Sequence, residues 1–475
     1  MKSYKQTAID IAVLSIAALI LRLAALGSES FWIDEIATLE RVSMGWHRMM
    51  DAVTALRYHG PLQYILAKLS CEAFGYGEFG ARLPSAILGA AAVPFFYLTA
   101  RRLAGRSCAL IASALLACST YHIAFSQEAR FYGITGFFTC ASMYFFVRLI
   151  HEKSLFAAIG YTIATSLMLY NHYYGIFVIL AQNITLLCDR RFLRCSQDIV
   201  RWLLVQTATA LLFAPWLFIV LEGLGKYGSD YKVLEAPGIM HLLATPWYYA
   251  DKQMLMTSIT AILILLFAVK AVRNRSLLSE NKVAVIWFVV PVIVPFAVSV
   301  LLTPIYSGRY ILAGSFGMFI IIAAAVNPLK GHMKKAALAL LACALIFGLY
   351  DYYRFPDNEQ WKEVAAYVEM NKAEGDVVIL HPAFNRRAYN YYARSDDAKG
   401  FPLFGQKLEE RGPEVSAENA PLIDEQTAGA ERVWLVLCHS YDKDNLIAEH
   451  LGKSYRQAER KQFHKIELLL FDSPN

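Results

Sequence analysis

Long apolar runs dominate this chain of 475 residues, and they limit what it can fold into more than any other feature. An α-helix needs about 20 largely apolar residues to cross the hydrocarbon core of a membrane. Hydrophobic residues make up 57% of the chain and charged residues 18%, against about 45–50% and about 25% in soluble domains. The sequence therefore predicts a polytopic α-helical membrane protein with about eleven transmembrane helices. We expect them at residues 8–26, 84–100, 108–125, 131–150, 155–170, 174–188, 202–221, 255–272, 283–302, 310–327 and 335–351.

The first run follows a basic N-terminus, MKSYKQTAID, and has two interpretations. A cleaved signal peptide has an apolar region of about 7–15 residues, followed by small residues at the cleavage site. This run is longer and no clean cleavage site follows it, so we expect a retained first helix.

Clusters of lysine and arginine give the expected orientation, because short cytoplasmic loops carry an excess of these residues. The clusters are Lys2/Lys5, Arg101/Arg102/Arg106, Arg190/Arg191/Arg194, Lys270/Arg273/Arg275 and Lys330/Lys334/Lys335. With the expected spans all of them fall on one side. We therefore place the N-terminus in the cytoplasm and the segment after residue 351 outside it. The net charge of +6 forms no stripe of the kind that binds nucleic acid, so no nucleic-acid partner is expected.

Two regions on the outer side are too long to be simple connections. Residues 27–83 contain two amphipathic stretches, which we expect to lie in the membrane interface within a transmembrane domain of residues 1–351. One has Leu39, Val42, Trp46, Met49 and Val53 at helical spacing, and the other begins at Gly60-Pro61. Residues 352–475 are more polar, and DVVIL, RVWLVLC and IELLLF read as strands with helices between them. This alternation predicts a small extracytoplasmic α/β domain.

An acidic pair, Asp34 and Glu35, follows the first expected span in the stretch FWIDEIATLE. Acidic residues suit the first turn of a helix, and Asp is a good N-cap. Charged groups near the hydrocarbon are also costly and tend to be functional. From the pair alone, a helix cap and a catalytic carboxylate are equally favoured.

Single arginines at the outer helix ends favour a functional interpretation. Arg82, Arg130 and Arg309 each precede a span on the side where positive charge is normally scarce. One such arginine would be explained by snorkelling to the interface. Several on one face predict an anionic ligand, since the guanidinium fork matches phosphate oxygens.

Further polar residues fall on the same side: His59, Tyr132, Tyr310, Gln127, Glu128, His172 and Tyr173. A single interfacial His or Tyr is usually an amphipathic anchor. Asp34, Glu128, His59 and His172 are oxygen and nitrogen donors that suit a divalent metal ion, but no close-spaced ligand motif joins them. No cofactor is therefore certain, and metal dependence stays open. The eight cysteines show no paired spacing, which argues against a disulfide framework and a zinc knuckle.

The order of these motifs resembles a known group of enzymes. A helix is followed by DE, HGPLQY, GEFGARLPSAILG, SQEARFYGI, HYYG and GRYIL. This order is similar to that of the polytopic, lipid-carrier-dependent glycosyltransferases of the GT-C fold, specifically the bacterial branch akin to protein mannosyltransferases and aminoarabinose transferases. The resemblance covers about residues 8–330 and is densest over 30–150.

The resemblance implies transfer of a sugar from a polyprenyl-phosphate carrier to an acceptor protein, lipid or glycan at the outer face of a bacterial inner membrane. It gives Asp34 the role of catalytic acidic residue, with Glu35 beside it, and matches His59 to the His of an HPPL motif in which Gly60 replaces a Pro. Arg82, Arg130 and Arg309, with His59, Tyr132 and Tyr310, are candidates for the donor phosphate. Gln127, Glu128, His172 and Tyr173 are candidates for the acceptor or for supporting contacts.

Two functions remain open at this point. Displacement of a phosphate from the anomeric carbon needs a base for the acceptor hydroxyl and a cationic site for the leaving phosphate, which Asp34 and the arginines supply. One-step displacement predicts inversion of the anomeric centre. The alternative is a transporter or flippase that moves a lipid-linked sugar without chemistry. Paired broken helices or inverted repeats would favour it, and the sequence shows neither.

Overall fold

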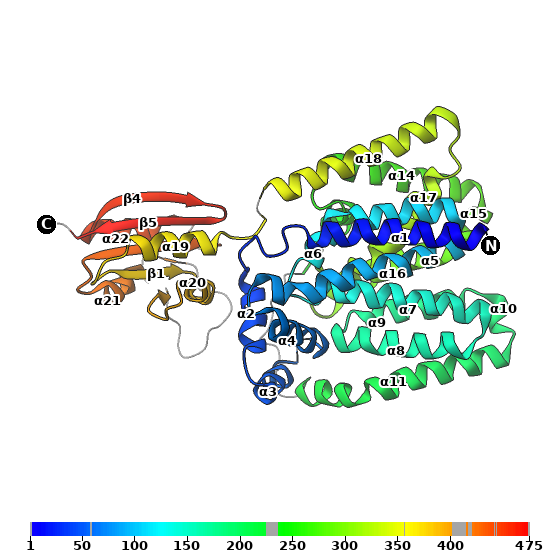
Figure 1. The fold of residues 1–475 in the computed structure, drawn as a ribbon, viewed down its shortest axis with the longest axis horizontal. Helices are drawn as coiled ribbons and strands as arrows, with labels where there is room; N and C mark the ends of the chain where they lie inside the picture. Colours follow the sequence, from blue (N-terminus) through cyan, green and yellow to red (C-terminus); the bar gives the residue numbers. More distant parts are fainter. Residues whose placement is uncertain are drawn as a thin grey trace. The chain divides into compact units, whose positions relative to one another are not determined.

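The structure is a computed structural model that describes residues 2–57, 59–224, 236–355, 357–400, 415–416, 420–440, 442 and 444–473. The chain forms two compact units (Figure 1). The first, here the membrane unit, comprises Met1–Leu26 and Arg41–Arg354. The second, here the C-terminal unit, comprises Gly27–Glu40 and Phe355–Asn475. The segment Gly27–Glu40, which our sequence-based division grouped with the transmembrane domain, is therefore part of the C-terminal unit.

Apolar helices build the membrane unit. Those long and apolar enough to cross a membrane, among the described residues, are α1 (Lys2–Leu23), α5 (Glu78–Cys118), α7 (Tyr132–Glu152), α11 (Ser196–Leu224), α14 (Met254–Arg273), α16 (Lys282–Leu301) and α18 (Gly331–Arg354). Shorter apolar helices are α8 (Leu155–Asn171), α9 (Gly175–Leu187) and α17 (Leu312–Val326). The expected fold class, a polytopic helical membrane protein with a small sheet-containing domain, is confirmed.

The second and third expected spans differ from the observed helices in where the chain bends and where it breaks. The spans at 84–100 and 108–125 fall on α5, in which Gly105 has φ 80° and bends the helix. Helix α5 ends at Cys118, and the separate α6 (Thr120–Ser126) continues after Ser119, whose hydroxyl accepts a hydrogen bond from the His122 N–H. Glycine adopts positive φ at no steric cost, which is why the bend falls at this residue.

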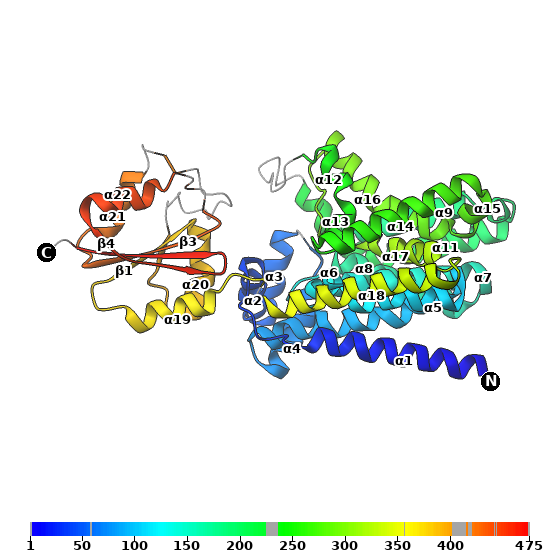
Figure 2. The same cartoon turned by 90° about the horizontal axis from the view of Figure 1, so that it is seen from above.

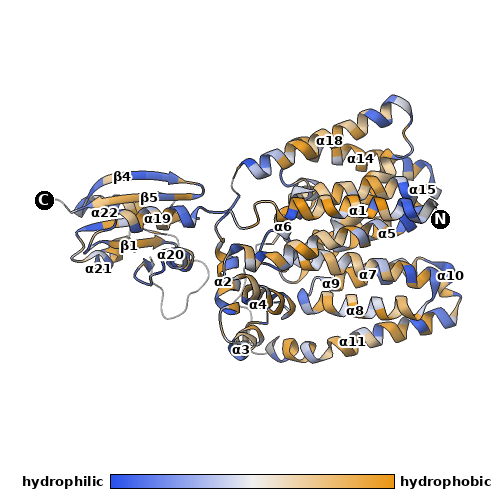
Figure 3. Cartoon of the chain, in the orientation of Figure 1, coloured by the Kyte–Doolittle hydropathy of each residue, from blue (hydrophilic) through white to orange (hydrophobic). Residues whose placement is uncertain are grey.

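Helix packing in the membrane unit is close. Helices α1 and α5 lie side by side in both views, as do α7 and α8 (Figures 1 and 2). Helix α17 is buried along its whole length. Hydrophilic residues gather at the end of the bundle that carries α10 (Arg190–Leu193) and α15 (Arg275–Glu280) (Figure 3). The short helices α12 (Ile239–Leu243) and α13 (Thr245–Tyr249) precede α14.

A buried arginine fixes the C-terminal end of α1. The Arg22 side chain is 1% exposed, and its guanidinium donates hydrogen bonds to the carbonyls of Ala18, Leu116 and Ala117 and to the Ser126 hydroxyl. The carbonyls of Leu116 and Ala117 belong to the last turn of α5, where intrahelical partners are missing. Arg22 therefore joins α1 to the end of α5 rather than snorkelling outward.

The segment between α1 and α5 contains three helices: α2 (Ile33–Val42), α3 (Trp46–Leu56) and α4 (Leu62–Phe74). Our expectation of one amphipathic stretch from Leu39 to Val53 is wrong, because the chain leaves the helix after Val42 and Gly45 caps α3. The expected start at Gly60-Pro61 is confirmed, since Pro61 is the N-cap of α4.

The C-terminal unit contains a five-stranded sheet in the order β2-β1-β3-β5-β4. Its strands are β1 (Val377–His381), β2 (Lys399–Gly400), β3 (Arg432–Cys438), β4 (Arg456–Phe463) and β5 (Ile466–Asp472), with β1 parallel to β2 and β3 and β5 antiparallel to β3 and β4. The helices are α19 (Trp361–Asn371), α20 (Arg386–Ala393), α21 (Asp424–Thr427) and α22 (Leu446–Ser454). Sequence analysis missed β4, an edge strand with a hydrophilic sequence (Figure 3).

Candidate active site

A glycine brings two histidines of the membrane unit together. His59 precedes Gly60, and a Cβ atom at position 60 would lie 1.7 Å from the Tyr170 carbonyl oxygen near the end of α8. Only glycine permits this approach, so the Pro of the HPPL motif, which also has a Cβ, would not fit here. The His59 and His172 ring centroids lie 5.3 Å apart as a result.

Stacked rings surround these histidines. The Phe131 ring lies 4.0 Å from the His172 ring at an interplanar angle of 20°, and 4.6 Å from the His59 ring. The Tyr310 ring lies 5.5 Å from His172. The fully buried Asn171 amide donates hydrogen bonds to the Phe131 carbonyl at 2.9 Å and to the Thr135 hydroxyl, which holds the start of α7 against the end of α8. We call His59, Arg130, Phe131, His172 and Tyr310 the His–Arg cluster.

Arg130 supplies the positive charge of the His–Arg cluster. It is 8% exposed, its Nη2 lies 3.4 Å from His59 Nε2, and its guanidinium carbon lies 5.3 Å from the Phe131 ring centroid. A guanidinium can only donate, so His59 Nε2 accepts this hydrogen bond. A buried arginine beside aromatic faces is well suited to binding a phosphate group, because its guanidinium is weakly hydrated and its donors match the phosphate oxygens.

His172 is neutral in this environment. Burial, and then the charge of Arg130, lower the pKa of His172 to about 3. The Tyr174 backbone N–H donates to His172 Nδ1 at 3.3 Å, which leaves the proton of the neutral ring on Nε2. His172 can therefore donate a hydrogen bond through Nε2 at neutral pH, but it is a poor general base.

A small cavity of about 10 Å³ adjoins the His–Arg cluster between Tyr132, Arg309 and Tyr310. This volume is about enough for one water molecule. The Tyr132 hydroxyl is buried and has no hydrogen-bond partner among the described residues. An unsatisfied buried hydroxyl is costly, so Tyr132 is a strong candidate for a contact with a bound ligand.

Three other predicted site residues form hydrogen bonds that fix loops and helix ends of the membrane unit. Arg82 Nη1 donates to the Leu26 carbonyl at 3.2 Å. The Gln127 side chain donates to carbonyls at the end of α1 and accepts a hydrogen bond of 2.7 Å from the Tyr352 hydroxyl. The Tyr173 hydroxyl donates to the Arg57 carbonyl and accepts from the Trp216 indole. These contacts order loops and helix ends of the membrane unit.

The acidic pair belongs to the C-terminal unit. Glu35 is completely buried and its Oε2 accepts a hydrogen bond of 3.3 Å from the Trp32 backbone N–H. A glutamate that reaches back three residues in this way forms half of a capping box, so Glu35 makes the cap contact. Asp34 is half-buried, and its backbone carbonyl accepts from the Thr38 hydroxyl within α2.

Contacts inside the C-terminal unit fix the segment before Asp34. The Phe31 N–H donates to the Tyr392 hydroxyl at 2.6 Å, and the Lys362 N–H donates to the Ser30 hydroxyl at 3.0 Å. The Glu29 carboxylate accepts from the backbone N–H groups of residues 357 and 358. The position of Asp34 therefore depends on residues more than 300 positions later in the chain.

The residues proposed as metal ligands do not form a ligand set in the described part of the chain. Glu128, His59 and His172 have no arrangement in which three ligand atoms converge. Glu359, Cys438 and His439 of the C-terminal unit do converge, and sequence analysis did not single out this group. Phe131, Asn171 and Tyr174 were not among the predicted site residues, because their contacts join segments distant in sequence.

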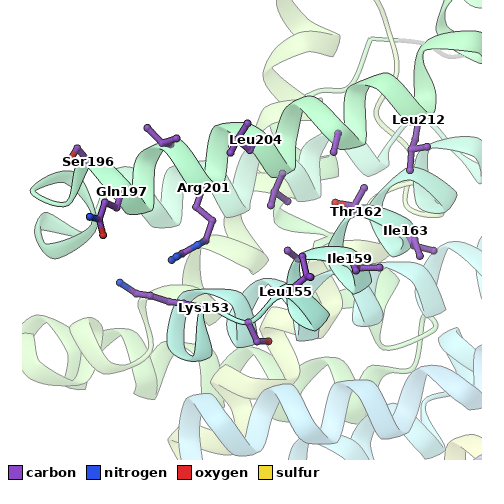
Figure 4. Close-up of a pocket in the computed structure, with 15 residues that line it drawn as sticks. Lys153, Leu155, Ile159, Thr162, Ile163, Ser196, Gln197, Arg201, Leu204 and Leu212 are labelled. Carbon is purple, nitrogen blue, oxygen red and sulfur yellow. The ribbon is translucent and has the colours of Figure 1, made fainter.

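A separate apolar groove of about 870 Å³ lies between α8 and α11 (Figure 4). Lys153 and Arg201 lie at one end of it, where both pair with Asp198 at 2.7 and 3.3 Å. No member of the His–Arg cluster is among the residues that line this groove.

Comparison with known proteins agrees with this geometry. Residues 58–219 match the family model described as dolichyl-phosphate-mannose-protein mannosyltransferase, and this segment contains His59, Arg130 and His172. No curated protein matches the chain by sequence.

Solved structures show the same fold. ArnT from Cupriavidus metallidurans in the apo state has 12% identity and a TM-score of 0.62, over 99% of this chain and 98% of that chain. The same protein bound to undecaprenyl phosphate has 13% identity and a TM-score of 0.57, over 97% of both chains. The oligosaccharyltransferase AglB from Archaeoglobus fulgidus, in complex with an inhibitory peptide and a dolichol-phosphate, has 11% identity and a TM-score of 0.54, over 91% of this chain and 69% of that chain. The resemblance seen in the sequence, to membrane glycosyltransferases of the GT-C fold, is confirmed.

Proposed function

We propose that this membrane protein of the glycosyltransferase GT-C fold transfers a sugar from a polyprenyl-phosphate carrier to an acceptor hydroxyl at the outer face of an inner membrane. The observation that carries the proposal is the His–Arg cluster, which places a buried arginine among stacked rings inside the segment that matches the mannosyltransferase family model. The N-terminus is then cytoplasmic and the C-terminal unit extracytoplasmic.

The carrier phosphate binds at Arg130 and Arg309 in this proposal. Arg130 is held by His59 and Phe131, and Arg309 lines the small cavity beside the unsatisfied Tyr132 hydroxyl. Two cationic groups and a hydroxyl donor stabilise the negative charge that develops on the leaving phosphate. The ArnT structure bound to undecaprenyl phosphate supports a lipid-phosphate ligand for this fold.

Asp34 acts as the general base for the acceptor hydroxyl. Glu35 is committed to the cap of α2, and His172 is too weakly basic, which leaves Asp34 as the better candidate among the predicted residues. A single displacement at the anomeric carbon inverts its configuration: the acceptor oxygen forms the new bond as the phosphate oxygen leaves. Arg82, Gln127 and Tyr173 order the loops that surround the donor.

The test measures sugar transfer from radiolabelled polyprenyl-phosphate sugars and compares hexosyl with pentosyl donors. The membranes contain equal amounts of each variant. Asp34→Asn should lower transfer by about 10²–10⁴-fold, the usual contribution of a general base. Glu35→Gln is the matched control, because its amide oxygen can still accept the Trp32 N–H, and it should retain most activity. Arg130→Gln should weaken donor binding.

Three results would contradict the proposal. Asp34→Asn with wild-type transfer would remove the base role, and a product with retained configuration would exclude single displacement. Wild-type protein that transfers no sugar from any donor, but moves labelled carrier between leaflets, would favour a flippase instead.

A further inference from the structure

Three potential metal ligands meet at one edge of the sheet in the C-terminal unit. Cys438 is the last residue of β3, and His439 follows it. Glu359 lies just before α19. Strands β1 and β3 are parallel, so their carboxyl ends share one edge, which is where ligands commonly bind in sheets of this kind.

The ligand atoms of these residues all lie within 4.8 Å of one another. His439 Nε2 is 2.7 Å from Glu359 Oε1. Ligand atoms of a tetrahedral zinc site lie about 3.3–3.8 Å apart, given metal–ligand distances of about 2.0–2.3 Å. The three side chains therefore need to move by only about 1 Å to bind a common ion.

Two of the three side chains have buried atoms that are able to bind a metal ion. Glu359 is 8% exposed, and its Oε2 is buried without a hydrogen-bond partner among the described residues. Cys438 is 1% exposed and is a free thiol. A buried carboxylate oxygen with no partner is costly, and a cation would satisfy it.

The backbone holds the group in a defined geometry. His439 has φ 52°, a left-handed conformation that is uncommon outside glycine and is often found at functional sites. The Asn385 amide donates to the Cys438 carbonyl at 2.7 Å and to the His381 carbonyl at 3.3 Å. The His439 side chain is 54% exposed, so an ion can enter from solvent on that side.

Cys438 would bind the ion as a thiolate, so metal binding would release the thiol proton.

We propose that Glu359, Cys438 and His439 bind a zinc ion. One sulfur, one nitrogen and one oxygen ligand suit Zn²⁺, with a water molecule in the fourth position on the exposed side. The ion joins the segment before α19 to the edge of the sheet, a role separate from sugar transfer.

The test uses Co²⁺ as a spectroscopic substitute for zinc in the purified full-length protein in detergent. Thiolate bound to Co²⁺ gives a charge-transfer band in the near ultraviolet, which reports the Cys438 ligand directly. Wild type should bind one equivalent with this band, and zinc should displace it. Cys343→Ser, which removes an exposed cysteine from α18, is the control and should bind as wild type does.

Variants of the ligands separate binding from folding. Cys438→Ser should lose the charge-transfer band, and Glu359→Gln should weaken binding by more than about tenfold. His439→Asn removes the imidazole at an exposed position where Asn tolerates the left-handed backbone, so it should fold and also bind more than about tenfold more weakly. Wild type without the band, or His439→Asn with unchanged affinity, would overturn the proposal.

Discussion

Substitution of Gly60 by alanine tests how the His–Arg cluster is assembled. The new Cβ would lie 1.7 Å from the oxygen, 2.2 Å from the carbon and 3.0 Å from the Cα of Tyr170. All three contacts are with backbone atoms at the end of α8, so no side-chain rotation relieves them. A carbon–oxygen contact needs about 3.3 Å, so the loop and α8 must separate by about 1.5 Å.

This displacement would move His59, which is the neighbouring residue. Extra atoms in a well-packed site cost typically about 1–3 kcal/mol, and a shift of about 1 Å in a positioning group can lower the rate by about 10²-fold. Gly60→Ala should therefore lower sugar transfer by about 10²-fold and also lower the melting temperature of the purified protein in detergent.

Gly45→Ala is the matched control, since Gly45 lies in the same segment between α1 and α5 with φ −59°, and a Cβ at this position would have no atom within 4 Å. Both variants should be assayed for transfer and for thermal unfolding side by side. If Gly60→Ala were as active and as stable as Gly45→Ala, the close approach to α8 would not be what positions His59.

Two further predictions concern the buried polar groups of the membrane unit. Arg22→Met leaves the last carbonyls of α5 without their hydrogen-bond donor, so it should lower the free energy of unfolding by at least about 2 kcal/mol. A lower melting temperature would show this loss. Ser126→Ala removes only one acceptor of the Arg22 guanidinium and should cost less stability. His172 has a folded-state pKa of about 3, lowered by burial and then by Arg130, so between about pH 6.5 and pH 5 the unfolded state gains a proton that the folded state does not. Stability should fall by about 2 kcal/mol over this range in wild type and by less in His172→Gln, as measured by thermal unfolding at both pH values; equal losses would show that His172 is not held neutral.

Local patterns in the sequence predicted the membrane helices and the start of α4 correctly. A span of apolar residues and a Gly-Pro pair are properties of a few consecutive residues, and they need no knowledge of distant contacts. Strand β4 has no such local pattern, because its hydrophilic residues at the edge of the sheet show little apolar alternation, and it was therefore not predicted.

The candidate site depended on contacts that sequence patterns do not contain. The sequence did not indicate which residue of the acidic pair makes the cap contact, and the hydrogen bond from the Trp32 N–H assigns that contact to Glu35. The pairing of His59 with His172 arises because Gly60 lies against Tyr170, which belongs to a helix far along the chain. The same limit applies to Glu359 and His439, whose positions at one sheet edge follow from strand order.

The assignment of Gly27–Glu40 to the C-terminal unit has a consequence for biosynthesis. The ribosome releases Ser30 and Phe31 early, but their partners, Lys362 and Tyr392, are made only near the end of translation. Domains generally fold as units once their residues are available. The segment that carries Asp34 therefore has to wait, while the membrane helices are already being inserted, until the last quarter of the polypeptide arrives. A chain that stops early would lack the partners that order this segment, even where every membrane helix is intact.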